Sequence, residues 1–140
     1  MSEEIRASGH DDLMGRALEV LERKENRSII MTNFVDFDAA WGHRRDVAGY
    51  GRELEAFDRE LPNLLACVQE EDLLIITADY GNDPTWSGTD HTREHVPLLL
   101  FGKSVEAGKD HGCRDSFTDI GETILSHLDL PAMGVGQSIL

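Results

Sequence analysis

The fold of this chain is decided by residues 73–83, L-L-I-I-T-A-D-Y-G-N-D. The aliphatic run over 73–78 predicts a buried strand, because both of its faces would be covered by apolar contacts. Asp79 ends that strand, where a charged side chain requires a pairing partner or a metal ion. A helix cap or a turn is the alternative role for Asp79.

Helical and strand patterns alternate on either side of this stretch. Helices are predicted over 11–24, 46–69 and 117–128, and strands over 28–35 and 96–101. Pro62 should kink the second helix or start a new one, because it removes a hydrogen bond. This alternation predicts the α/β class, with a mostly parallel sheet flanked by helices. We expect one domain over 1–140, with residues 1–9 disordered.

Two further polar segments carry the residue types that bind metals. The first is V-D-F-D-A-A-W-G-H-R-R-D, which contains Asp38 and His43, and the second is G-T-D-H-T-R-E-H, which contains His91. In open α/β sheets ligands bind beyond the carboxyl ends of the strands, so the first segment and Asp79 should share one edge. Carboxylate and imidazole groups are usual ligands of zinc, manganese and iron.

Other residues near these segments remain alternatives. Asp36 competes with Asp38, and any of the polar neighbours of His91 could replace it, namely Asp90, Arg93, Glu94 and His95. Arg44 and Arg45 suit a phosphate contact, although a salt bridge to surface acids is the competing interpretation. The other histidines, His10, His111 and His127, are predicted to be surface or packing residues.

Composition restricts the class of partner. The chain has a formal net charge of -14 from 27 acidic and 13 basic residues. This charge disfavours binding to nucleic acid or an anionic membrane. The first residues lack an apolar signal region, and Cys67 and Cys113 lack metal-like spacing. We therefore expect a cytoplasmic protein with reduced thiols.

Three long motifs carry a family resemblance. They are N-F-V-D-F-D-A-A-W-G-H-R-R-D-V-A-G-Y, D-L-L-I-I-T-A-D-Y-G-N-D-P-T-W-S-G-T-D-H-T-R-E-H-V-P-L-L and the ending G-Q-S-I-L. In this order the segments resemble the C-terminal part of the catalytic core of phosphopentomutase, in the alkaline phosphatase superfamily. The likeness covers residues from about 10 to 140. Cofactor-independent phosphoglycerate mutases share related elements.

The resemblance implies a two-manganese enzyme that interconverts the 1-phosphates and 5-phosphates of ribose and deoxyribose. Asp38, His43 and His91 would hold one Mn²⁺. Asp79 would hold the other, together with the following residue and an aspartate near the enzyme's N-terminus. Here that following residue is Tyr80, a weak ligand where the family has histidine. The family's phosphorylated threonine and cap domain are absent, so this chain alone is expected to be inactive.

Several functions stay open on the sequence. The chain is either a phosphopentomutase-like fragment, a non-catalytic metal-binding module, or a remnant. Phosphoglycerate mutase or phosphomonoesterase activity is the enzymatic alternative. Half a sheet would leave an unpaired edge. We therefore expect a homo-oligomer, poor solubility, or a partner chain that supplies the N-terminal half.

Overall fold

The computed structural model describes residues 2–23, 25 and 27–140. The chain divides into two compact units. Unit 1 contains the chain up to Val68 and Ile76–Leu98, and unit 2 contains Gln69–Ile75 and Leu99–Leu140. Met1, in the segment expected to be disordered, and Lys24, at the end of the first predicted helix, lie outside the described residues.

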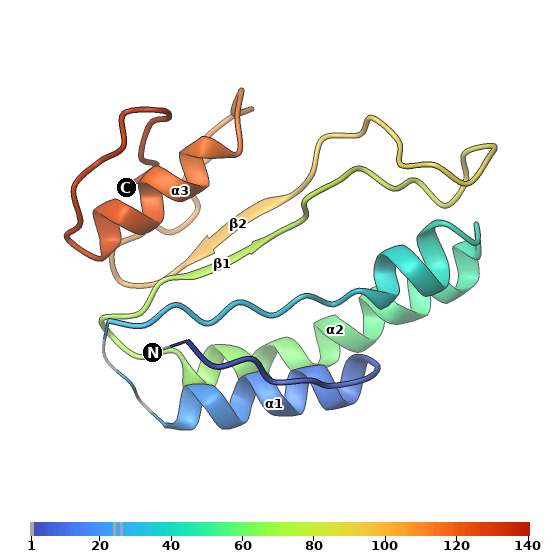
Figure 1. Cartoon of the computed structure of the whole chain (residues 1–140), viewed down its shortest axis with the longest axis horizontal. Coiled ribbons are helices and arrows are strands. Elements are labelled where there is room, and N and C mark those ends of the chain that lie inside the picture. The colour runs from blue at the N-terminus through green and yellow to red at the C-terminus, as the bar shows by residue number, and fades with distance from the viewer. Residues whose placement is uncertain (1, 24, 26) are drawn as a thin grey trace. The chain divides into compact units, whose positions relative to one another are not determined.

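Two amphipathic helices pack against each other in unit 1 (Figure 1). They are α1 (His10–Glu22) and α2 (Val47–Cys67), and they confirm the helices predicted from the sequence. The Asp46 side chain caps α2 by accepting a hydrogen bond from Gly49 N. The helix continues through Pro62, so the prediction of a new helix there is wrong. The single hydrogen bond that proline removes is a small part of a 21-residue helix whose apolar face is packed.

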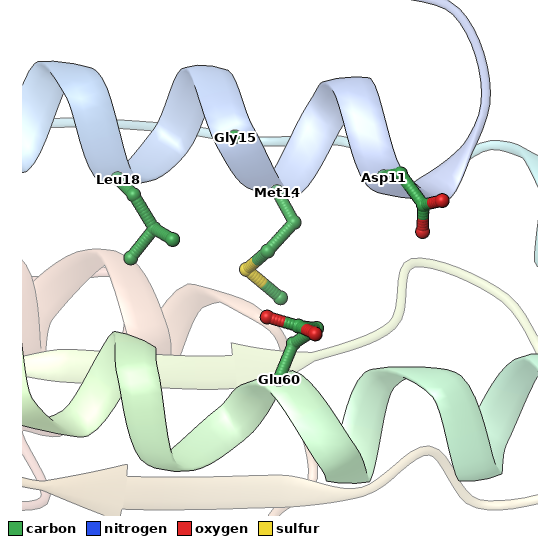
Figure 2. Close-up of a pocket in the computed structure, with 5 residues that line it drawn as sticks. All are labelled: Asp11, Met14, Gly15, Leu18 and Glu60. Carbon is green, nitrogen blue, oxygen red and sulfur yellow. The ribbon is translucent and has the colours of Figure 1, made fainter.

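The side chain of His10 is buried where α1 meets α2. Its ring lies against those of Phe34 and Phe57, and its Nδ1 is 3.0 Å from Glu53 Oε1. His10 is therefore a packing residue, one of the two roles that the sequence predicted. Further along the same helix pair, Figure 2 shows a shallow pocket whose lining residues are Asp11, Met14, Gly15, Leu18 and Glu60. This pocket contains none of the predicted metal ligands.

The sheet differs from the prediction. It has two strands, β1 (Leu74–Thr77) and β2 (Leu98–Phe101), and they are antiparallel rather than parallel (Figure 1). An antiparallel bridge between Gly81 and Thr92 extends the pairing into the connecting loop. Parallel strands need a crossover, usually a helix, and the fully described loop 78–97 contains none. The expected mostly parallel sheet is therefore wrong for this chain.

The predicted strand over 28–35 is also wrong. The segment is extended, but it forms no strand in the described part of the chain (Figure 1). Ile29 is 66% exposed and Met31 is 90% exposed. An apolar run becomes a strand only when a second strand accepts and donates its backbone hydrogen bonds, and none pairs with this one among the described residues.

Unit 2 is organised around α3 (Thr118–His127), which confirms the predicted final helix. The chain after α3 folds back onto it (Figure 1). Three side chains of α3 accept hydrogen bonds from backbone N–H groups of this tail, namely Asp119 from Gln137, Glu122 from Met133 and Val135, and Thr123 from Ile139. These buried polar groups are satisfied by the tail, which explains why α3 tolerates them on its packed face.

None of the helices in the described residues combines the length and apolar character needed to cross a bilayer.

Candidate metal centre

A π-helical turn brings Asp38 and His43 together. The turn, η1, spans Phe37–Gly42, and His43 N donates a hydrogen bond to Asp38 O over 2.9 Å. In π-helical geometry a residue bonds to the one five positions earlier, so the D-x-x-x-x-H spacing matches one turn. The two side chains consequently lie on the same side of the backbone, and His43 Nε2 is 3.2 Å from Asp38 Oδ1.

His91 completes the cluster from a distant loop of the same unit. Its Nε2 lies 3.0 Å from Asp38 Oδ1, although the two residues are 53 positions apart. One ligand atom from each of Asp38, His43 and His91 can be chosen so that all three lie within 4.8 Å of one another. Among the described residues this is the one group of three or more potential ligands with such spacing. The structure therefore brings together the three residues predicted for the first metal site.

The donor set and spacing suit a divalent metal ion. Ligands at about 2.0–2.2 Å from one ion lie roughly 3–3.6 Å from each other. The two separations from Asp38 Oδ1, 3.2 Å to His43 Nε2 and 3.0 Å to His91 Nε2, fall in this range. His43 Nδ1 contacts the carbonyl oxygen of Thr89. A carbonyl only accepts hydrogen bonds, so Nδ1 carries the proton, and the lone pair of neutral His43 is on Nε2, facing Asp38. This outer contact is typical of histidines that bind metals.

A second layer of contacts holds the Asp38 carboxylate. Asn82 Nδ2 donates a hydrogen bond to Asp38 Oδ1 over 2.7 Å. Gly42 allows this approach, because a Cβ at that position would collide with the Asn82 side chain. Asp38 Oδ1 therefore faces an amide donor and two imidazole nitrogens at once.

The two arginines after His43 have different environments. All three nitrogens of Arg45 donate to protein acceptors. Arg44 is exposed, and its Nε donates to Ala39 O over 3.2 Å. These hydrogen bonds go to backbone carbonyls and to the Asn82 amide, and not to the surface acids considered as the alternative. Phosphate binding by Arg44 and Arg45 stays a prediction.

The described residues do not bring the predicted ligands of the second metal site into one cluster. Asp79 is exposed and does not belong to the ligand cluster found among the described residues. Tyr80 instead stacks on His91, with ring centroids 4.3 Å apart and planes 14° apart. Asp79 and Tyr80 as ligands remain a prediction that depends on residues outside this chain.

Burial and hydrogen bonds shift the pKa values of two further groups, Tyr50 and Asp83. Burial, and secondarily the negative charge of Asp38, raises the pKa of the Tyr50 hydroxyl above its ordinary value. The backbone N–H of Thr85, followed by its hydroxyl, lowers the pKa of the Asp83 carboxyl. Asp83 is therefore held ionised as a turn residue in the loop that leads to His91.

The geometry also separates the triad from its alternatives. Asp36, Asp90, Glu94 and His95 do not belong to the ligand cluster. Asn82 and the Thr89 carbonyl were not predicted as parts of the site. The asparagine in D-Y-G-N-D was a usable signal, since it lies three residues after the predicted ligand Asp79. A backbone carbonyl leaves no such signal.

Comparison with known proteins identifies the class. Residues 6–132 match the metalloenzyme superfamily, and the chain belongs to that family. More particularly, the whole chain is 51% identical to a phosphopentomutase of Vibrio cholerae serotype O1. It is 49% identical over the same 140 residues to phosphopentomutases of Yersinia enterocolitica and Yersinia pseudotuberculosis. The resemblance seen in the motifs is thereby confirmed.

The chain spans about a third of the length of these relatives. All 140 residues align, and they cover 34% of each relative. The remaining two-thirds of a phosphopentomutase has no counterpart in the sequence described here. The comparison therefore does not show that this chain has the relatives' complete activity.

Proposed function

We propose that this chain is the metal-binding C-terminal part of a phosphopentomutase-type core and binds one Mn²⁺ through Asp38, His43 and His91. The relatives at about 50% identity support the type of enzyme, and the convergence of three donor atoms supports the metal site. Mn²⁺ rather than another divalent ion follows from the family resemblance. The free cysteines, Cys67 and Cys113, are compatible with a reducing cytoplasmic setting.

The observation that carries the proposal is the contact between His43 and Asp38. His43 Nε2 lies 3.2 Å from a carboxylate oxygen of Asp38, and a ring that donates from Nδ1 to the Thr89 carbonyl has its lone pair on Nε2 when it carries one proton. Two electron-rich atoms at this distance repel each other unless a cation lies between them, either a second ring proton or a metal ion. His91 Nε2 adds a third donor at 3.0 Å from the same oxygen.

The proposed chemistry is phosphoryl transfer on a pentose phosphate. A bound divalent metal supplies charge neutralisation to phosphate oxygens in such reactions. The residues of this chain contribute the ligand triad and its orientation through Asn82 and Thr89. No threonine here corresponds to the phosphorylated residue implied by the resemblance. We therefore predict no mutase turnover by the isolated chain.

A partner that supplies the missing part of the core is the second element of the proposal. No backbone hydrogen bond involves residues 28–33 among the described residues. Ile29, Ile30 and Met31 on this segment are exposed. In the part of the chain that the structure describes, few apolar residues are nearly fully buried, namely Met14, Ala17, Leu64 and Ile139. An extended apolar segment with free backbone groups is suited to pairing with a strand from another polypeptide.

Reconstitution tests the proposed activity. The chain is mixed with a polypeptide covering the unmatched two-thirds of the Vibrio cholerae phosphopentomutase, and conversion of ribose 1-phosphate to ribose 5-phosphate is measured with Mn²⁺. We expect activity in the mixture, none from either part alone, and loss of activity with His43→Ala. Turnover by the isolated chain, or a mixture that binds together but stays inactive, would contradict the proposal.

The proposed docking segment is tested by pull-down in the same mixture. Met31→Asp places a charge on the extended segment and should abolish complex formation. Met133→Asp is the matched control, because Met133 is 74% exposed and lies in the tail of unit 2. Equal binding by both variants would exclude residues 28–33 as the docking element. Self-association of the chain without the added polypeptide would identify a second copy as the occupant instead.

A further inference from the structure

We propose that Arg45 is a positioning residue that fixes the orientation of the Asp38 carboxylate through the side-chain amide of Asn82. This inference rests on the proposed metal site and adds to it a residue that does not touch the metal. Three observations support it, namely the hydrogen bonds of the guanidinium group, the orientation of the amide and the backbone conformation of Arg45.

The Arg45 guanidinium joins the π-helical turn to the loop that carries His91. It donates five hydrogen bonds, with lengths from 2.6 to 3.1 Å. Its acceptors are the carbonyl oxygens of Gly42, Asp83, Gly88 and Asp90 and the side-chain oxygen of Asn82. Four of these five acceptors lie in residues 82–90. Three of these acceptors face Nη1, which has two N–H groups, so two of them share one hydrogen. The planar guanidinium reaches the set from three nitrogens, whereas a lysine ammonium donates from one atom.

The bond from Arg45 to Asn82 determines which end of the amide faces Asp38. Arg45 Nη1 donates to Asn82 Oδ1 over 2.8 Å. A guanidinium has no acceptor, so the oxygen of the amide must point toward Arg45 and the NH₂ group must point the other way. That NH₂ group donates to Asp38 Oδ1 over 2.7 Å. Without Arg45 the amide could rotate and present its oxygen to the carboxylate, which would repel it.

The backbone at Arg45 is consistent with a conformation enforced by the side chain. Its φ is 56°, in the left-handed region that residues other than glycine rarely adopt. Such conformations are strained and persist where surrounding contacts determine them. The five hydrogen bonds of the guanidinium are the contacts that hold this residue in place.

Metal titration of four variants tests the inference. Arg45→Lys keeps the positive charge and removes the planar group, and Arg45→Ala removes both. Asn82→Ala removes the link to Asp38 and leaves the guanidinium and its four carbonyl acceptors. Arg59→Ala, an exposed arginine on α2, is the control for the loss of one positive charge.

We expect Mn²⁺ affinity to fall about 10- to 100-fold in both Arg45 variants and in Asn82→Ala, and to stay unchanged in Arg59→Ala. The visible absorption of the Co²⁺-substituted protein should also change in Arg45→Lys, because its intensity and wavelength report ligand geometry. Circular dichroism establishes whether each variant retains its helices. Should the Arg45 variants unfold, Asn82→Ala still decides between the alternatives.

The outcomes separate this inference from the proposed metal site. If the unaltered chain binds no Mn²⁺, the proposed site itself is wrong. If the unaltered chain binds Mn²⁺ and Asn82→Ala or a folded Arg45→Lys binds it equally well, with the same Co²⁺ spectrum, the positioning role is wrong.

Discussion

Asn82 donates a hydrogen bond of 2.7 Å to the carboxylate of Asp38, a residue 44 positions earlier in the chain. This contact joins the loop after β1 to the π-helical turn η1. It places a neutral donor on the oxygen that both imidazoles of the triad also face. The proposed metal site would therefore depend on the packing of two loops as well as on its three ligands.

Replacing Gly42 with alanine should weaken metal binding without altering a ligand. The added Cβ would collide with the Asn82 side chain and with the Phe37 carbonyl oxygen of η1, so the contact between the amide and Asp38 would be displaced. We expect a fall in Mn²⁺ affinity of about 10-fold or more, measured by calorimetric titration. Gly51→Ala on α2 is the matched control, because a Cβ added there would meet nothing within 4 Å. Equal affinity in the two variants would show that the Asn82 contact is dispensable.

Restoring histidine at position 80 should not create a second metal site in this chain. Tyr80→His would place an imidazole beside Asp79, but two ligands alone bind a divalent ion weakly. We expect one Mn²⁺ per chain by equilibrium dialysis at micromolar metal, for Tyr80→His and for the control Tyr80→Phe alike. Two tightly bound ions in Tyr80→His would show that the third ligand is supplied from within these 140 residues.

The tail of unit 2 should loosen when Thr123 is replaced by valine. Thr123 is fully buried, and its hydroxyl donates to Asp119 O over 2.6 Å and accepts from Ile139 N over 3.0 Å. Valine has a similar shape but leaves the buried Ile139 N–H without an acceptor, at a cost of about 1–3 kcal/mol. Hydrogen exchange at the Ile139 and α3 amides should accelerate accordingly. Ser126→Ala, at an exposed position of α3, should leave exchange unchanged.

The stability of unit 2 should fall at acid pH because of Asp119. The N–H of Gln137, and then Arg114, lowers the pKa of the Asp119 carboxyl below its ordinary value of about 3.9. A lowered pKa in the folded state stabilises the fold above the ordinary value, and that contribution disappears as pH falls through the folded value. Protection of α3 amides should therefore decline below about pH 4. Asp119→Asn should show a smaller decline, and an identical pH dependence would rule out this carboxylate as the cause.

The triad could be predicted from the sequence because its spacing has a local cause. Asp38 and His43 lie one π-helical turn apart, and His91 lies in a densely polar segment. The positioning residues could not be predicted in the same way. Four acceptors of Arg45 lie in residues 82–90, which are 37 to 45 positions away. Most of them are backbone carbonyls, which any residue type provides.

The helices were predicted correctly because their apolar residues recur at helical spacing over many turns. The strands were predicted less well, because strand formation depends on a partner. Residues 28–35 have the composition of a strand but no neighbour to pair with among the described residues. The direction of pairing between β1 and β2 was predicted wrongly as parallel. The loop that connects the two strands has no helical pattern, and this absence favours an antiparallel arrangement.

The most direct test of the central claim is a calorimetric titration of the metal-free chain with Mn²⁺, alongside His91→Ala. We predict one binding site per chain in the unaltered protein and its loss in the variant, because His91 is one of the three proposed ligands. Absence of binding to the unaltered chain, or equal binding by His91→Ala, would contradict the assignment of Asp38, His43 and His91 as a metal centre.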